Sequence, residues 1–168
     1  MNVETLEDLF GYQLQRAYYV ERTQVELLAE MAANTSDDDL ADRLATHREQ
    51  TEEHVVRLEG LFEALGRQPR ASRTRTADGV AESWRQHEES PEAIPTALEI
   101  ALISERLEIR TYESLLTLAG RLAYAEDIVE PLEAILEEER ATLDALEAIE
   151  TERSVLELVA ADETYSSH

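Results

Sequence analysis

The sequence predicts an all-α protein that folds as one four-helix bundle. The 168 residues include only five Gly and four Pro, and helix-forming Ala, Leu and Glu are abundant. Apolar residues recur at steps of three and four along four long segments, as on the buried face of an amphipathic helix. We expect residues 1–161 to form one domain with a substantial core and residues 162–168 to form a flexible tail.

The first two long helices are expected at about residues 5–33 and 36–65. Thr5 and Asp8 have the spacing of a capping box at the start of the first helix. The turn falls at Asn34-Thr35-Ser36, and Ser36 is expected to cap the second helix, whose first turn is acidic. The short turn predicts an antiparallel helical hairpin.

The connection between the two halves of the chain begins at Gly66, a residue type that commonly follows a helix end. Residues 66–76 are rich in arginine, contain no acid and show no apolar period, which predicts a solvated loop. A short helix is expected at residues 77–89, with Val80 and Trp84 on its buried face.

The second pair of long helices follows. Ser90 and Pro91 are typical of a helix start, and the third long helix is expected to run to about Gly120. The fourth covers Ile128 to Ile149, and residues 155–159 either continue it or form a short terminal helix. Two hairpins joined by a longer connection make an up-and-down bundle of the ferritin-like kind.

Polar residues interrupt the apolar face of each long helix at mid-length. An isolated buried carboxylate costs several kcal/mol, so it is kept only when it is protonated, paired or bound to metal. The two hairpins place these residues level with one another, because residues equidistant from a turn lie at the same height and a helix rises about 1.5 Å per residue. The interrupting residues are Glu21, His47, His54, Glu105, Glu108 and Glu139, with Glu138 beside the last.

Carboxylate and imidazole donors suit iron or manganese, and a bridging carboxylate can hold two such ions together. Structural alternatives remain for several residues. His47 is either a ligand or a satisfied core histidine, and Tyr112 is most simply a core residue, although Tyr18 and Tyr112 lie one turn from interrupting glutamates. The acids could also pair with Arg106 or Arg110, but these two point off the apolar face, which favours ligation.

The charge is strongly negative. The chain has 38 acidic residues against 15 basic ones and a net charge of -23, and every basic residue is Arg. Complete absence of lysine favours a salt-adapted source over an ordinary acidic protein, because molar salt screens self-repulsion. Such a surface disfavours nucleic acid as a partner.

Several other classes of protein and site are also disfavoured by the composition. Cysteine is absent, which excludes disulfides and thiolate sites. No apolar run approaches the roughly 20 residues of a membrane helix, and no signal-peptide pattern occurs. We therefore expect a cytoplasmic protein without a membrane partner.

Four blocks occur in order over about residues 4–150: TLEDLFGYQLQRAYYVERTQ, HREQTEEHVVRLEGLF, ERLEIRTYESLLTLA and LEEERATLDAL. In this order and spacing they resemble the YciE/YciF-type family of ferritin-like stress proteins. The short helix TADGVAESW also lies where that family has one. The resemblance implies a helical bundle with a dinuclear metal centre similar to that of rubrerythrin, a homodimer and a role in stress.

Carried over by position, the resemblance implies ligands on all four long helices. Its pattern for the second helix covers His47, Gln50, Thr51 and His54, with Gln50 where a carboxylate often stands. A further departure is that the sequence contains no Glu-x-x-His motif, which ferritin-like metal sites usually have. The ligand set that we expect is Glu21, Gln50, His54, Glu105, Glu108, Glu138 and Glu139.

The predicted function is metal binding, with one or two ions of iron or manganese inside the bundle. By analogy with the family, the work of such a centre is oxidation of Fe(II) or consumption of peroxide, as in a di-iron or di-manganese oxidoreductase. The alternative is a non-enzymatic, dimeric helical interaction protein in which the buried acids are structural.

Overall fold

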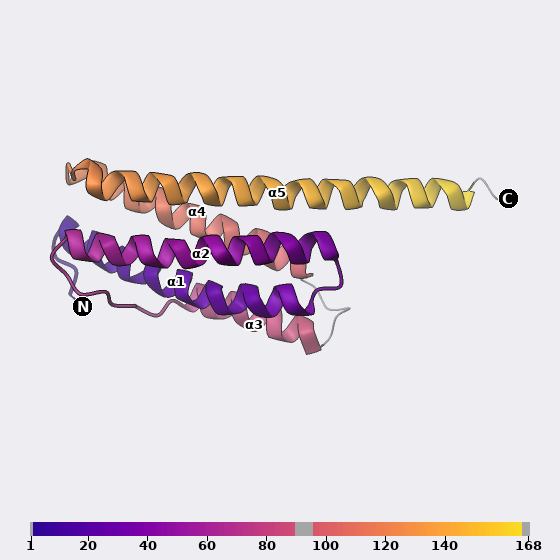
Figure 1. Ribbon diagram of the computed structural model, residues 1–168, viewed down its shortest axis with the longest axis horizontal. Helices are drawn as coiled ribbons and strands as arrows, with labels where there is room; N and C mark the ends of the chain where they lie inside the picture. The colour runs from indigo at the N-terminus through magenta and orange to yellow at the C-terminus, as the bar shows by residue number, and fades with distance from the viewer. Residues whose placement is uncertain (1, 90–95, 166–168) are drawn as a thin grey trace.

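The part of the chain that the computed structural model describes, residues 2–89 and 96–165, consists of helices and the segments that connect them (Figure 1). The prediction of an all-α fold is confirmed. The five helices are α1 (Leu6–Asn34), α2 (Asp38–Ala64), α3 (Arg75–Glu89), α4 (Ala97–Arg121) and α5 (Glu126–Tyr165).

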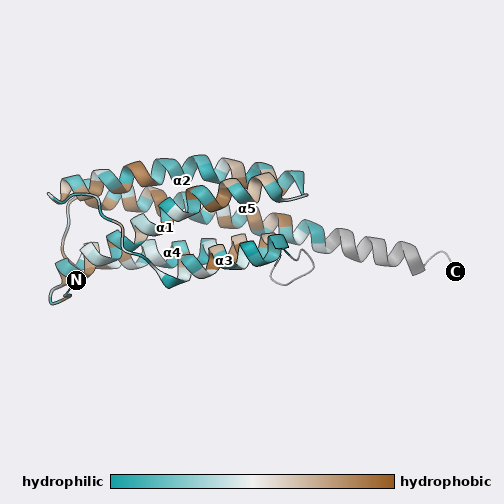
Figure 2. Cartoon of the chain, turned by 90° about the horizontal axis from the view of Figure 1, so that it is seen from below, coloured by the Kyte–Doolittle hydropathy of each residue, from teal (hydrophilic) through white to brown (hydrophobic). Residues whose placement is uncertain are grey.

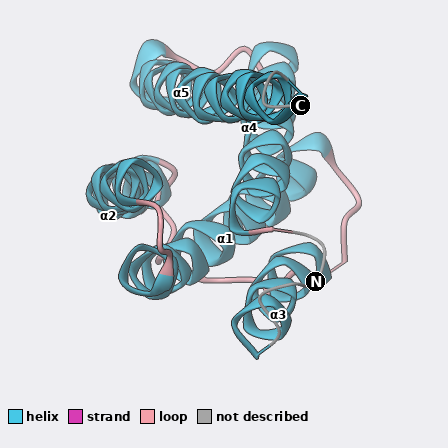
Figure 3. Ribbon diagram, turned by 90° about the vertical axis from the view of Figure 1, so that its right-hand side faces the viewer, coloured by secondary structure: helices cyan, strands magenta, loops and turns pink. Residues whose placement is uncertain are grey.

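The four long helices surround a shared interior. α1 packs against α2 and α4, and α5 packs against the same two helices. The short helix α3 lies beside α1 and α4, away from α2 and α5 (Figure 3). In the described part of the chain, no helix is both long and apolar enough to cross a membrane.

The first hairpin has the expected caps with one exception. Thr5 and Asp8 form the capping box of α1. The cap of α2 is Asp37 and not Ser36, because the Asp37 carboxylate accepts a hydrogen bond from Leu40 N at 2.7 Å. An adjacent carboxylate competes well for this position, since it also interacts favourably with the positive end of the helix. Gly66 adopts φ +67° after α2, as predicted.

The arginine-rich connection lies along α1. Ser72 N donates to Gln15 O at 3.0 Å, and the Arg67 guanidinium lies where a Cβ on Gly11 would be. A glycine on this face of α1 thus lets the loop pack closely. α3 then starts at Arg75, two residues earlier than expected, and buries Val80 and Trp84 as predicted.

The second hairpin differs from the prediction at its start. α4 begins at Ala97 with Thr96 as its cap, so the expected start at Ser90 and Pro91 is wrong, and those two residues lie outside the described part. The capping box of Thr96 and Glu99 satisfies the backbone at the later position.

Helix α5 is continuous through residues 155–159, so these residues continue the fourth long helix and do not form a separate one. Its C-terminal part extends past the ends of the other helices (Figure 1). The helix reaches Tyr165, later than the expected end at residue 161, and residues 166–168 lie outside the described part.

The core consists of two apolar clusters separated along the bundle. Hydrophobic and hydrophilic residues alternate along the coloured part of each helix (Figure 2). One cluster includes Phe10, Tyr112 and Leu132, and the other includes Met31 and other residues from α2, α3, α4 and α5. On every long helix the change from one cluster to the other falls at the polar residues, which therefore meet at mid-height.

Candidate metal centre

Six acidic and histidine side chains meet between the two apolar clusters, each exposed by 2% or less. All four long helices contribute, because each breaks its apolar face at the same height. These residues are Glu21, His47, His54, Glu105, Glu108 and Glu139.

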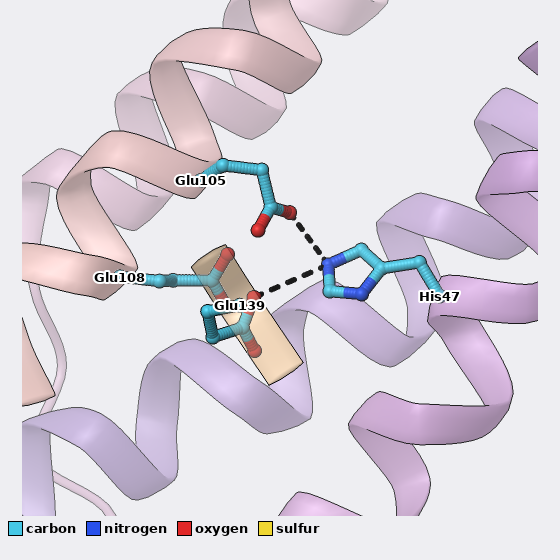
Figure 4. A group of neighbouring side chains, drawn as sticks. All are labelled: His47, Glu105, Glu108 and Glu139. Atoms are coloured by element: carbon cyan, nitrogen blue, oxygen red, sulfur yellow. Dashed lines mark ion pairs between the residues drawn. The ribbon is translucent and has the colours of Figure 1, made fainter. Parts of the chain in front are cut away.

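The larger group of donors joins α2, α4 and α5. His47, Glu105, Glu108 and Glu139 each offer one ligand atom, and these atoms all lie within 4.8 Å of one another. The four side chains point toward a common centre (Figure 4). His47 Nε2 lies 2.6 Å from Glu105 Oε1 and 3.7 Å from Glu139 Oε2.

A second group adjoins the first and shares one residue with it. Glu21, His54 and Glu139 also bring ligand atoms within 4.8 Å of one another. His54 Nδ1 lies 2.9 Å from Glu139 Oε1 and 3.6 Å from Glu21 Oε2. Oε2 of Glu139 therefore faces His47 while Oε1 faces His54, which is the arrangement of a carboxylate that bridges two neighbouring ions.

Many atoms of this cluster lack hydrogen-bond partners. Both carboxylate oxygens of Glu108 and of Glu139 are buried without one, as is Nδ1 of His54 despite its close contact with Glu139. Buried polar groups nearly always have hydrogen-bond partners in folded proteins. A cluster of buried oxygen and nitrogen atoms without such partners therefore calls for an explanation. Carboxylate oxygens and imidazole nitrogens are donors that iron and manganese accept, and the cluster can hold such an ion.

Burial dominates the electrostatics of the acids. Removal from water raises the pKa of Glu105 and of Glu139 to about 7, and it raises the pKa of Glu108 well above its usual value. The pKa of Glu21 is also raised by burial, although its contact with His54 opposes the change. Without a cation, protons therefore compensate part of the buried charge.

The two histidines differ in their protonation. Burial lowers the pKa of His47, which keeps its ring neutral. Burial would also lower the pKa of His54, but its contacts with Glu139 and Glu21 outweigh that effect and raise the pKa to about 11. A metal ligand must be deprotonated, so binding at this cluster would release protons and strengthen with pH.

Outside the two groups, neighbouring residues orient the donors. The Tyr112 hydroxyl donates to Glu21 Oε1. Glu138, with 31% of its side chain exposed, lies 2.7 Å from His54 Nε2 and accepts from Arg57 Nη1 at 2.9 Å. A carboxylate on one ring nitrogen leaves the other directed at the centre, as is usual around metal-binding histidines.

The predicted site residues are thus distributed unequally. Five of them converge, Glu138 contacts His54 from outside both groups, and Gln50 is half-buried on α2. Ligation by Gln50 stays a prediction. The Tyr18 hydroxyl donates to Glu59 Oε1 at 2.8 Å and not to Glu21.

Sequence reasoning missed one buried polar pair and left one residue undecided. Gln24 Nε2 donates to Ser104 Oγ between α1 and α4. Gln24 could have been found from its place on the apolar face one turn after Glu21, whereas a serine on a helix carries little signal. His47, left open between ligand and core residue, is a member of the larger group.

Comparison with known proteins places this cluster in a family context. The family model described as "Domain of unknown function (DUF892)" matches residues 5–158. Protein YciF of Escherichia coli (strain K12) is 30% identical over 148 residues, which cover 84% of this chain and 88% of YciF.

Solved structures agree. The crystal structure of the E. coli stress protein YciF matches with a TM-score of 0.80 at 28% identity, over 88% of this chain and 95% of that one. YcfI from Rhodopseudomonas palustris matches with a TM-score of 0.81 at 28% identity, over 87% and 95%. A Xanthomonas campestris protein, at 22% identity and a TM-score of 0.71 over 95% and 99%, shares the fold. The chain therefore belongs to the DUF892 family and is a YciF-type helical protein, as the four sequence blocks predicted.

Proposed function

We propose that the bundle binds two divalent ions, iron or manganese, side by side at the buried cluster. The observation that carries this proposal is Glu139, whose two oxygens face two separate groups of donors. Glu105, Glu108 and His47 hold one ion, and Glu21 and His54 hold the other. Glu138 and Tyr112 fix the orientation of His54 and Glu21.

Such a centre would support redox chemistry. Iron and manganese supply one-electron steps when bound by carboxylates and imidazoles. With Fe(II) as the reducing substrate, the cluster would supply the two electrons that, together with two protons, convert hydrogen peroxide into two water molecules. The E. coli relative YciF is described as a stress protein, and a role in stress fits consumption of peroxide.

Location and assembly are proposed on the relationship to the family alone. We infer a cytoplasmic protein that forms a homodimer. Both inferences can be checked by fractionation of the source cells and by light scattering in molar salt.

One observation favours a second candidate. The two histidines already contact acids, His47 with Glu105 and His54 with Glu139. On that view the cluster is a buried ion-pair network, and the bundle is a dimeric interaction protein without turnover.

Metal content distinguishes the two candidates. The protein is purified in molar salt without added metal or chelator, loaded with Fe(II) or Mn(II), and its metals are determined by elemental analysis. We expect about two equivalents in the native protein and, in Glu105→Gln/Glu108→Gln, loss of at least the ion that these two carboxylates hold. The matched control is Glu133→Gln/Glu137→Gln on α5, which removes the same charge at exposed positions.

The outcomes are exclusive. Native protein that stays empty after loading would make the buried acids structural and favour the interaction protein. Full metal content in the Glu105/Glu108 variant would refute the ligand assignment, whereas loss in the exposed control would show that net charge and not ligation governs binding.

A further inference from the structure

We propose that the pocket between α1, α3 and α4 is the route by which a small uncharged oxidant, with hydrogen peroxide as the probe, reaches the buried centre. The inference rests on the proposed function and adds the class of co-reactant and its path. The proposal rests on Glu108, which is a member of the larger donor group and also lines the pocket.

The pocket has the dimensions of an entry channel for small molecules. Its volume is about 220 Å³, enough for several water molecules at about 30 Å³ each. It lies where α3 covers the α1/α4 face, with Ala77 and Val80 on one wall. Hydrogen peroxide is little larger than water, so the pocket has room for it.

The inner end of the pocket is polar. Gln24 and Ser104, joined by a hydrogen bond between α1 and α4, line the pocket beside Glu108. Ser104 lies one turn before Glu108 on the same helix, so the two side chains are neighbours. These amide and hydroxyl groups offer hydrogen bonds to a polar, uncharged guest directly before the unsatisfied Glu108 carboxylate.

Two arginines lie at the mouth of the pocket. Arg16 and Arg110 both line it, and Glu108 is the one acid among the lining residues. Arg110 contacts Glu113 at 3.2 Å, outside the lining, whereas Arg16 lies over the ring of Tyr12. In a chain of net charge -23, two cations at an opening disfavour entry of a divalent metal ion but leave an uncharged molecule unaffected.

The test narrows the mouth without touching the metal donors. Leu107 lines the pocket and is 40% exposed, so Leu107→Trp adds bulk at a position that tolerates it. The matched control is Ile103→Trp, one turn earlier on α4, 47% exposed and not among the lining residues. Far-UV circular dichroism and thermal melting establish that both variants fold.

Two readouts follow. Mn(II)-loaded protein is examined by the relaxation of water protons, which reports how freely water reaches the bound ion whether or not any oxidation occurs. Fe(II)-loaded protein is mixed with hydrogen peroxide in a stopped-flow instrument. In Leu107→Trp we expect unchanged metal stoichiometry, a loss of water relaxation, and oxidation slowed about fivefold, which corresponds to about 1 kcal/mol. Ile103→Trp should match the native protein in all three.

The possible results distinguish a failure of the proposed function from a failure of the entry route. Native protein without bound metal overturns the proposed function and this inference with it. Bound metal with equal relaxation and equal oxidation rates in both variants overturns the route alone, as does bound Mn(II) that does not relax water in the native protein. Bound Fe(II) that hydrogen peroxide does not oxidise overturns the assignment of the oxidant.

Discussion

Replacing Glu105 by glutamine should stabilise the metal-free protein while it weakens metal binding. Burial raises the pKa of Glu105 from 4.5 to about 7. At pH 8 the folded chain therefore carries an ionised carboxylate that burial disfavours. Each pKa unit corresponds to about 1.4 kcal/mol, so ionised Glu105 costs the metal-free fold on the order of 3 kcal/mol. Glutamine has nearly the same shape and carries no charge.

The gain is an upper bound, because the substitution also removes the close contact between the carboxylate and His47 Nε2. In a chain of this size, 1 kcal/mol shifts Tm by about 2–4 °C, so the metal-free variant should melt up to about 10 °C higher. The assay is thermal and urea unfolding at pH 8 with chelator, in constant high salt, with Glu133→Gln as the exposed control.

Loaded protein should show the reverse order. A ligand that binds only the folded state adds about 4.1 kcal/mol at a concentration one thousand times its Kd. This exceeds the gain of about 3 kcal/mol in the metal-free variant, and Glu105→Gln forfeits it. The reasoning would be refuted by a metal-free variant that is less stable than the native chain. Such a loss would mean that the pairing of Glu105 with His47 stabilises the fold, as the interaction-protein candidate requires.

Two further predictions test the acids and the caps. The raised pKa values of Glu105 and Glu139 favour the folded state fully below pH 4.5, and this contribution is lost as pH rises through about 7. The Tm of chelated protein should therefore fall between pH 5 and pH 8, by less in Glu105→Gln than in the native chain; equal slopes would contradict the assignment. Asp37→Ala should cost about 1 kcal/mol in urea unfolding, whereas Ser36→Ala should be nearly neutral, because Asp37 caps α2; the opposite order would refute the cap.

The height of the site was predictable from the sequence because it depends on two regular quantities. The axial rise of a helix and the antiparallel course of a hairpin fix which residues are level, and Glu21, the two histidines and Glu139 did converge. The angular position of a residue around its helix also predicted whether its side chain is buried. Glu139 lies on the apolar line of α5 and is fully buried, whereas the adjacent Glu138 is turned toward the edge, where Arg57 reaches it.

The exact helix caps were not predictable where two nearby residues are both suitable. Ser36 and Asp37 are both good caps, and the structure selects Asp37, which also pairs with Arg153 from α5. Ser90 with Pro91 has the local pattern of a helix start, yet Thr96 with Glu99 forms the capping box. The pairing of Gln24 with Ser104 joins residues 80 positions apart, and no local pattern encodes such a contact.

The arrangement of the core explains how the chain can carry so costly a centre. Each end of the bundle has its own apolar cluster, one around Phe10 and Leu132 and the other around Met31 and Trp84. Burial of these side chains stabilises the helices by about 1.5–3 kcal/mol each, which offsets the unsatisfied carboxylates between them. We therefore expect the bundle to fold without metal. Metal bound as proposed would add stability at mid-height, and the same clusters would keep the donors close together after the ions are removed.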